Sequence, residues 1–538
     1  LTGTAQQRVI EFTGTISGAR VIRFPLLTEN FYIIKNGTSG AHTVQLKAIS
    51  GSGATVTFAA DDKGYKIIYL DGVATNTGVF DAALSSAGIT FKEGGTNFTN
   101  SLLVGTDSTG TLNAAQKNVG VGTTVFAALT SGDNNTAVGF DSLKANTTAN
   151  NNTAVGKNSL TANTIGCENV AVGSNSLDAN TTGDYNTAVG YDSLSSNTEG
   201  NYNTAVGCNA LKLNTTGETN IAVGSNSLDA NTTGVSNVAL GFASLGANTT
   251  ANDNTAVGSK SLQLNTTGTR GVAVGFESLK ANTTGYGNIG VGYAALTANT
   301  TASDNVAVGI QALDANTTGA NNTAIGSSAL SANTTGGTNV AVGVNALNKN
   351  TQGDNNVAVG VLALCTNTTG DCNTAIGHCA LKVNTTGVQN TAVGGFALDA
   401  NTTASNNTAV GFNVLTANTT GGQNVAIGTS ALDANTSGNE LTTVGYNSLG
   451  ANTTGCYNVA VGDNALAANT TGNDNTTIGM RSLLNNTTGT NNTGVGRNAL
   501  RENITAANNT AVGSSSLACN TTGANNAAVG KSSMGSNT

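Results

Sequence analysis

The sequence predicts an all-β protein in which a small N-terminal β-sandwich or barrel precedes a parallel β-roll or β-solenoid. Two observations indicate this fold class. Residues 1–82 hold short segments rich in β-branched and aromatic residues, which favour strands. From Asn118 to Thr538 the chain repeats a 17-residue unit without insertion or deletion, and so strict a period is the sequence signature of a repeat architecture.

The N-terminal part contains six predicted strands. They are rich in Val, Ile, Phe, Tyr and Thr, often alternate, and are separated by Gly, Ser, Asn and Asp. Short strands at this spacing predict a small antiparallel sandwich or barrel over residues 1–82. The predicted strands are 8–16, 20–26, 31–38, 42–49, 54–60 and 65–72.

Residues 83–117 are predicted to be a transition segment, in which strand-like patches are broken by glycines. Val104 lies 17 residues before Val121, so we expect the register of the repeat to begin near Ser101.

The repeat is represented by NTAVGKNSLTANTIGCE at 152–168, and its opening Asn is counted as position 1. Position 4 runs from Val121 to Val529, a distance of 408 residues or 24 steps of 17, which gives 25 coils over 118–538. One coil buries too few apolar side chains to offset the ordering of its backbone, so coils must stack. At about 4.8 Å per coil the stack is a rod of roughly 120 Å.

Strand alternation predicts which residues of a coil face inward. Positions 1–5 and 7–11 read as two strands, and the N-T-T-G turn follows at positions 12–15. Val155, Leu160 and Ala162 (positions 4, 9 and 11) are then expected inside, with position 10 in water. Position 3, Ala154 in this coil, is expected outside, where positions 1, 3 and 5 form a flat self-association surface. The alternative is that duplication copied this alanine without selection.

Composition and charge exclude several classes of function. Charged residues make up 9% of the chain, the net charge is −8 and no basic run is present, so nucleic-acid binding is not expected. No stretch approaches the ~20 consecutive apolar residues of a transmembrane helix. The two histidines, His42 and His378, lie in different regions, and no HExxH, P-loop or Ser-His-Asp order is present. We therefore predict no enzyme and no catalytic or cofactor-binding residues.

The seven cysteines do not form a disulfide framework. Cys365 and Cys372 flank one N-T-T-G turn and are the one candidate pair, although free thiols are favoured. Together with His378 and Cys379 they form the only cluster that resembles a metal site. Its spacing matches no standard zinc finger, so no metal is predicted.

Other features of the turn allow alternatives. Asp133 and Asp184, in GDNN and GDYN, are expected to be structural turn acids rather than calcium ligands. The N-T-T triplets match the N-glycosylation pattern but are expected to serve as turns. Thr at positions 13 and 14 would form rows, as in an ice-binding solenoid, but these residues sit in a turn rather than on a flat face.

The motifs NTAVG, NVAVG and NVAIG, followed by x-x-[SA]-L, resemble the SVAIG-type head repeats of YadA-like trimeric autotransporter adhesins. This resemblance covers 118–538 and implies a left-handed parallel β-roll that assembles as a homotrimer. Similar repeats with NTTG turns occur in bacteriophage tail-fibre proteins. The family's usual unit is about three residues shorter, and the extra residues here lie in the NTTG turn. The N-terminal strands and NSLLVGTDSTGTLNAAQKNVGVG (100–122) are also similar to segments of phage fibre proteins.

The resemblance implies a structural tail-fibre protein of a virion that forms a rigid trimeric shaft for host-surface attachment. Its expected partners are two further copies, other virion or tail proteins and a host cell-surface receptor such as a polysaccharide, with no membrane insertion. The alternative is a bacterial cell-surface adhesin or extracellular filament of the YadA-like type. No coiled-coil stalk or anchoring barrel is visible, which favours the virion. The chain begins at Leu1 and stops within a coil, so we expect a processed product or a segment of a longer protein.

Overall fold

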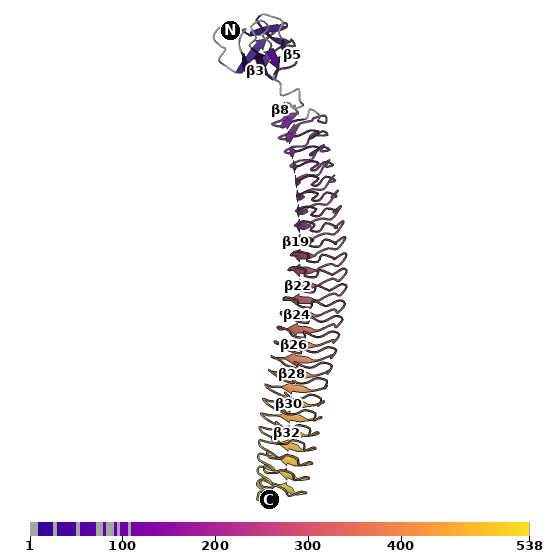
Figure 1. Ribbon diagram of the computed structural model, residues 1–538, viewed down its shortest axis with the longest axis vertical. Coiled ribbons are helices and arrows are strands. Elements are labelled where there is room, and N and C mark those ends of the chain that lie inside the picture. Colours follow the sequence, from indigo (N-terminus) through magenta and orange to yellow (C-terminus); the bar gives the residue numbers. More distant parts are fainter. Residues whose placement is uncertain are drawn as a thin grey trace.

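The computed structural model shows a compact group of strands at the N-terminal end, followed by a long, gently curved stack of coils (Figure 1). The described residues form strands, turns and bends and contain no helix, which confirms the all-β prediction. The residues that the structure describes are 9–24, 29–49, 54–71, 79–81, 91–93, 97–105 and 109–536.

Each of the six predicted N-terminal segments contains a strand, and a seventh strand follows them. Their apolar residues alternate, as in β4, where Val44, Leu46 and Ala48 are buried and the residues between them are half-buried. The strands are β1 (Val9–Thr15), β2 (Arg20–Phe24), β3 (Glu29–Ser39), β4 (Val44–Ala48), β5 (Val56–Phe58), β6 (Tyr65–Asp71) and β7 (Val79–Asp81).

These strands form two mixed sheets, so the expectation of purely antiparallel pairing was wrong. One sheet has the order β1-β3-β6-β7 and the other β2-β4-β5. β1 runs parallel to β3, and β2 runs parallel to β4, whereas the remaining pairs are antiparallel. The physical reason is the short link after β1, which carries β2 into the second sheet, so that β3 returns beside β1 in the same direction. Phe24, Ile34, Leu46, Phe58 and Ile68 share one core between the sheets.

The stack begins where the repeat register predicts. β10 (Leu102–Val104) pairs in parallel with β12 (Val119–Val121), and the residues opposite each other are 17 apart. The antiparallel strand β8 (Phe91–Glu93) covers the other edge of β10. One further pair, β9 (Phe98–Thr99) with β11 (Ala115–Gln116), carries the same offset. The predictions for residues 83–90, 94–96 and 106–108 of the transition segment lie outside the described residues.

The solenoid contains one three-residue strand per coil, at positions 2–4. These strands run from β12 (Val119–Val121) to β36 (Ala527–Val529), each beginning 17 residues after the one before. Every neighbouring pair is parallel and in register, as in β14 (Thr153–Val155) with β15 (Val170–Val172). The 25 predicted coils and their parallel stacking are therefore confirmed.

Backbone hydrogen bonds continue around the coil beyond the strand. In the coil 152–168 the amides at positions 2, 5, 7, 9, 11, 13 and 17 all donate to carbonyls of the coil above or below. Asn158 N, for example, donates to Phe140 O at 2.8 Å, and Leu160 N donates to Ser176 O at 3.0 Å. Each coil is thus bonded to its neighbours on all of its sides, which makes the stack one continuous ladder.

The second predicted strand, at positions 7–11, is absent. Positions 7 and 9 adopt left-handed backbone conformations, as at Asn158 (φ +58°) and Leu160 (φ +51°), and these interrupt the two-residue alternation of a strand. Ser159 and Leu160 (positions 8 and 9) therefore both point into the core, while Ala162 (position 11) is only half-buried. The inward prediction is confirmed for position 9 and wrong for position 11.

Glycine at position 5 is required by the stacking of the backbone. Gly156 has φ +141°, and a Cβ there would lie 2.3 Å from the carbonyl oxygen of Gly173 in the next coil. A backbone collision of this kind cannot be relieved by a rotamer change, so the chain turns at a residue without a side chain.

The predicted orientation of the strand was also wrong. Ala154 (position 3) is fully buried, whereas Val155 (position 4) is 36% exposed. The reason is the narrow interior: at Gly290, another position 3, a Cβ would lie 3.3 Å from Cγ of Leu279 and 2.5 Å from Oγ of Ser278. Only a small residue such as Ala, Gly or Thr fits between the strand and the opposite wall, so positions 2 and 4 are turned outward. The surface predicted from positions 1, 3 and 5 does not exist.

Two ladders of buried asparagine run through the interior. At position 12, Asn180 Nδ2 donates to Asn163 Oδ1 of the preceding coil at 2.8 Å. At position 1, the backbone amide of Asn152 donates to Asn135 Oδ1 at 3.0 Å. Both ladders meet at position 15, where the carbonyl of Gly166 accepts from Nδ2 of Asn152 and of Asn163, each at 2.9 Å. Apart from Oδ1 of Asn146, which is buried without a partner, the stacking itself satisfies the amides of these ladders.

Candidate interaction surface

The outward face of the solenoid, defined here as the side chains at positions 2 and 4, is a strip of β-branched residues. Alternation about the buried position 3 places both positions on the surface. Position 4 is Val, Ile or Leu in all 25 coils, and position 2 is Thr, Val or Ile in all but the last, where Ala527 stands. No charged residue occurs at either position. The strip therefore runs uncharged along the whole stack.

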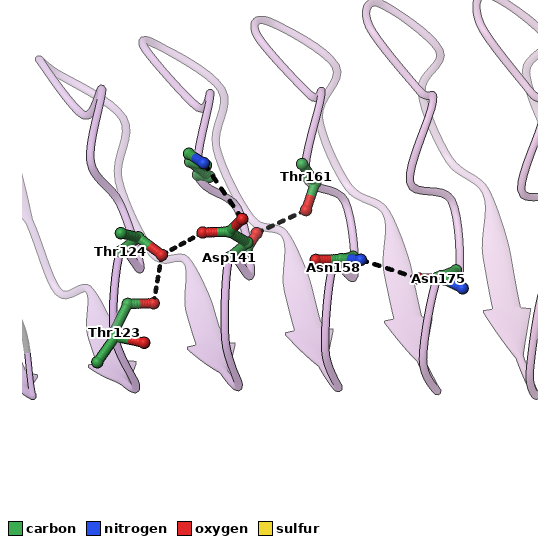
Figure 2. Close-up of polar contacts among 7 residues, drawn as sticks. Thr123, Thr124, Asp141, Asn158, Thr161 and Asn175 are labelled. Carbon is green, nitrogen blue, oxygen red and sulfur yellow. Dashed lines mark hydrogen bonds and ion pairs between the residues drawn. The ribbon is translucent and has the colours of Figure 1, made fainter.

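A corner row at position 6 lies two residues beyond this face. Figure 2 shows Thr123, at position 6, beside the tip of its strand, while Thr124, Asp141, Asn158 and Asn175, at position 7, form a separate row. Large apolar side chains are frequent in the corner row and are strongly exposed. They include Phe140, Tyr191, Phe242, Phe276, Tyr293, Ile310, Val344, Val361, Phe412 and Tyr446, which are 42–60% exposed.

Exposed apolar residues of the solenoid are concentrated on these rows. Of the 39 large apolar side chains exposed from Asn118 onward in the described part of the chain, 30 lie at positions 2, 4 and 6. If each position-4 residue exposes about a third of its side chain, that row alone presents roughly 1,000 Å², whereas the largest apolar patch of a typical monomer is about 300–600 Å². A contiguous patch of this size indicates an interaction surface.

The row at position 7 is mostly polar, and several of its side chains are hydrogen-bonded to one another. Thr124 Oγ1 donates to the carboxylate of Asp141, Lys144 Nζ lies 3.1 Å from the same carboxylate, and Asn158 Nδ2 donates to Asn175 Oδ1 at 3.0 Å (Figure 2). These groups find their partners within the chain, so this side of the coil has less need of a second molecule than the apolar strip.

The charges divide the remaining surface into two unlike flanks. We define the forward flank as positions 6–11, which follow the strand, and the rear flank as positions 12–17, which precede the next one. The forward flank carries 11 basic and 10 acidic residues, and the rear flank carries 11 acidic residues and one base, Arg270. The rear-flank acids are Asp133, Glu168, Asp184, Glu199, Glu218, Asp253, Asp304, Asp354, Asp371, Glu440 and Asp474.

Five aspartates of the forward flank stand at position 10, beside the Leu row. Burial raises the pKa of each carboxyl, because the half-buried site disfavours the charged form. Oδ1 of Asp178 and of Asp314 is buried without a hydrogen-bond partner. The expectation that position 10 points to water is therefore only partly met. The five residues are Asp178, Asp229, Asp314, Asp399 and Asp433.

The turn residues have structural partners. Asp184 Oδ1 accepts from the backbone amide of Cys167 at 2.6 Å, and Asp133 Oδ1 accepts from that of Gln116 at 2.7 Å, which confirms them as turn acids. The Thr hydroxyls at position 13 donate to the next coil, as from Thr164 Oγ1 to Thr181 O at 3.0 Å. From Thr130 to Thr487 the hydroxyls of that row are therefore engaged within the chain, and only the exposed position-14 row remains for an ordered ice lattice.

The cysteine cluster is not brought together as a bonded site. All seven cysteines are free thiols, so Cys365 and Cys372 are not paired. Cys379 is buried, with its Sγ 3.6 Å from Nε2 of His378, and desolvation raises the pKa of the Cys365 thiol. Within the described residues no three His, Cys, Asp or Glu side chains are grouped to hold a metal ion. His42 lies just before β4 in the N-terminal strands.

The outward face was misplaced by sequence reasoning, although a signal for it was present. A position restricted to Ala, with rare Gly or Thr, marks a steric limit, which belongs to an interior. Position 2 accepts Thr, Val or Ile. Such tolerance of size and polarity is typical of a surface strand position.

Comparisons with protein-family models, curated proteins and solved structures find no match. In addition, the described part of the chain has no helix with the length and apolar character needed to cross a bilayer. The shape of the stack and the chemistry of its faces are therefore the observations that bear on function.

Proposed function

We propose that this chain forms the shaft of a virion fibre in which three copies lie side by side, holding an attachment region away from the particle. The elongated ladder supports a mechanical role, because each coil is bonded to the next around its full circumference. The number three and the virion setting follow the resemblance of the repeats to YadA-like heads and tail fibres.

The observation that carries the proposal is the outward face. A monomeric rod would leave this apolar strip in water along its whole length, at a cost of about 25 cal/mol for each Å² that association would bury. A partner that covers the whole strip must match the distance between successive coils over all 25 of them. Another copy of this chain does so without further requirement.

The assembly state tests the shaft. The native mass of the full chain is expected to be three times 53.1 kDa, and negative-stain images should show rods of uniform width. A mass equal to one chain would overturn the proposal, and a mass of two chains would correct the number of copies.

A charged variant tests the role of the face. Val274→Glu combined with Val308→Glu places carboxylates on the outward face, so we expect loss of association. The matched control, Thr284→Glu with Thr318→Glu, adds the same charge to the exposed position 14 of the same two coils, and its mass should be unchanged.

The proposal that the chain belongs to a virion is tested by locating the protein. An antibody raised against the chain is expected to label an appendage on virus particles that carry the gene. Labelling of a cell surface in the absence of particles would instead support the adhesin alternative.

A further inference from the structure

We infer that Tyr185 and Tyr457, on the rear flank, are binding sites for guanidinium groups carried by arginine side chains of a partner polypeptide. The inference is independent of the proposed shaft, because both tyrosines stand at position 17 and the outward face consists of positions 2 and 4.

Position 17 is an unfavourable place for a tyrosine. The backbone there is left-handed, with φ +58° at Tyr185 and +60° at Tyr457, a conformation that asparagine tolerates and bulky residues rarely adopt. Asparagine accordingly occupies position 17 in eight coils. The two tyrosines are 46% and 55% exposed, so burial does little to offset the cost of this backbone. Residues held in such conformations are concentrated at functional sites.

One face of the Tyr185 ring is covered and the other is open. The ring stacks on that of Tyr202, one coil later, with 4.8 Å between the ring centroids and 4° between the planes. The position-17 residue one coil earlier is Glu168, which is exposed. The uncovered face of Tyr185 therefore borders a coil that carries a carboxylate. Consistent with this proximity, the negative charge of Glu168 is the main cause that raises the pKa of Tyr185.

The same arrangement recurs at Tyr457, which lies 272 residues, or 16 steps of 17, beyond Tyr185. Glu440 occupies position 17 one coil before Tyr457, and Asp474 occupies it one coil after; all three residues are exposed. In the part of the chain that the structure describes, none of the ion pairs includes an acid of the rear flank. Carboxylates therefore stand beside these rings without a counter-charge.

A ring beside a carboxylate selects a cation. The face of an aromatic ring is negative, and a neighbouring carboxylate adds to the negative potential there. A cation placed above the ring is attracted by both groups. A guanidinium suits this place because it is planar, stacks on aromatic faces and binds a carboxylate through two N–H groups.

The chain itself places a guanidinium on another tyrosine of the rear flank. Arg270, at position 17, lies over the ring of Tyr286 in the next coil, with its Cζ 5.7 Å from the ring centroid. One coil before Tyr185 and Tyr457, position 17 holds glutamate instead of arginine. These two rings thus have a neighbour that attracts a guanidinium rather than one that supplies it, so the group must come from another molecule.

Binding of a fluorescent hexa-arginine peptide to the full chain tests the sites. At about 4.8 Å per coil the two tyrosines are roughly 77 Å apart, whereas an extended hexapeptide spans about 20 Å, so we expect about two peptides per chain. Tyr185→Ser with Tyr457→Ser should weaken binding about two- to fivefold. Tyr185→Phe with Tyr457→Phe keeps both ring faces and should retain the affinity.

Charge variants separate these sites from a general attraction to an acidic surface. Glu168→Gln with Glu440→Gln removes two charges beside the rings and should weaken binding. Asp354→Asn with Asp371→Asn removes two charges from coils whose rear flank has no tyrosine, and it keeps an oxygen for the backbone amides that these side chains accept. Its effect should be smaller than that of the glutamine variant. Circular dichroism checks that each variant keeps its β-structure.

The outcomes distinguish these sites from the shaft. Equal losses in the two charge variants, with none in the serine variant, would overturn the sites in favour of non-specific attraction. Equally tight binding of a hexa-lysine peptide or of a glucosamine hexamer would overturn the assignment of a guanidinium. Ring-dependent binding of hexa-arginine by rods of single-chain mass would overturn the shaft and leave the sites standing.

Discussion

Asn299 Nδ2 donates to Oδ1 of Asn282, its counterpart one coil earlier, at 2.8 Å, and both side chains are buried. The same amide donates to the carbonyl of Ala302 at 3.0 Å, and Asn299 Oδ1 accepts from Asn316 at 2.9 Å. Each interior asparagine of the position-12 ladder therefore accepts a hydrogen bond from the following coil and donates one to the preceding coil.

Replacement of this link should open the stack locally. Asn299→Ala leaves the Asn316 amide without this acceptor in a buried site, which costs about 1–3 kcal/mol. Hydrogen exchange should accelerate for the amides of coil 288–304 and its neighbours. The control Thr301→Ala, at exposed position 14, is expected to leave exchange unchanged. Equal protection in the two variants would contradict a stabilising role for the ladder.

The strand β23 (Val306–Val308) offers a test of which side faces inward. Ala307→Leu adds bulk to a fully buried site and should destabilise the coil by about 1–3 kcal/mol, whereas Val308→Leu enlarges a residue that is 37% exposed on the single chain and should cost less. Local hydrogen exchange again provides the measurement. If Val308→Leu destabilised the coil more than Ala307→Leu, position 4 rather than position 3 would face the interior, as the strand alternation predicted.

Acid should stabilise the stack through the aspartates at position 10. Their pKa values are raised by burial, so the unfolded chain loses these protons at lower pH than the folded chain does. Stability from this source is thus full below the ordinary carboxyl pKa and declines as pH rises through the raised one. Replacing all five with Asn should raise the melting temperature at pH 7, by a margin that shrinks on acidification. A margin independent of pH would rule out titration as the cause.

The N-T-T triplets of the folded chain should remain unmodified. Their asparagines are the position-12 ladder, whose side-chain nitrogens are buried and already donate two hydrogen bonds, as in Asn180. Exposure of the folded protein to an oligosaccharyltransferase with its glycan donor should leave every triplet unmodified in peptide mapping. Modified triplets in a chain that keeps its β-structure would show that the ladder is open to solvent.

The pattern of residues in the sequence was sufficient to predict several features of the fold. The 17-residue spacing of Val121 and its equivalents determined the coil length, the number of coils and the parallel register, because each coil must repeat the geometry of the last in order to stack. The inward Leu row at position 9 followed as well. The six N-terminal strands were visible in their apolar alternation, but their parallel partners were not, since pairing depends on how a short link routes the chain.

Alternation could not decide which side of the strand was interior. Ala154 and Val155 alternate equally well in either orientation, and the size of an apolar residue does not by itself place it in the core. Only the folded coil shows that the space opposite position 3 is already filled by Ser and Leu, as at Ser278 and Leu279. The left-handed residue at position 9 carries no reliable signature either, because Leu seldom adopts that conformation.

The sequence by itself therefore determined that residues 118–538 form a stack of equivalent coils, since each 17-residue unit must repeat the geometry of the one before in order to stack on it. The tertiary structure decided what those coils show to the outside. The width of the interior is set only when the strand packs against the residues at positions 8 and 9 of the folded coil. That packing places the alanines of position 3 inside and leaves a strip of valine and threonine on the surface.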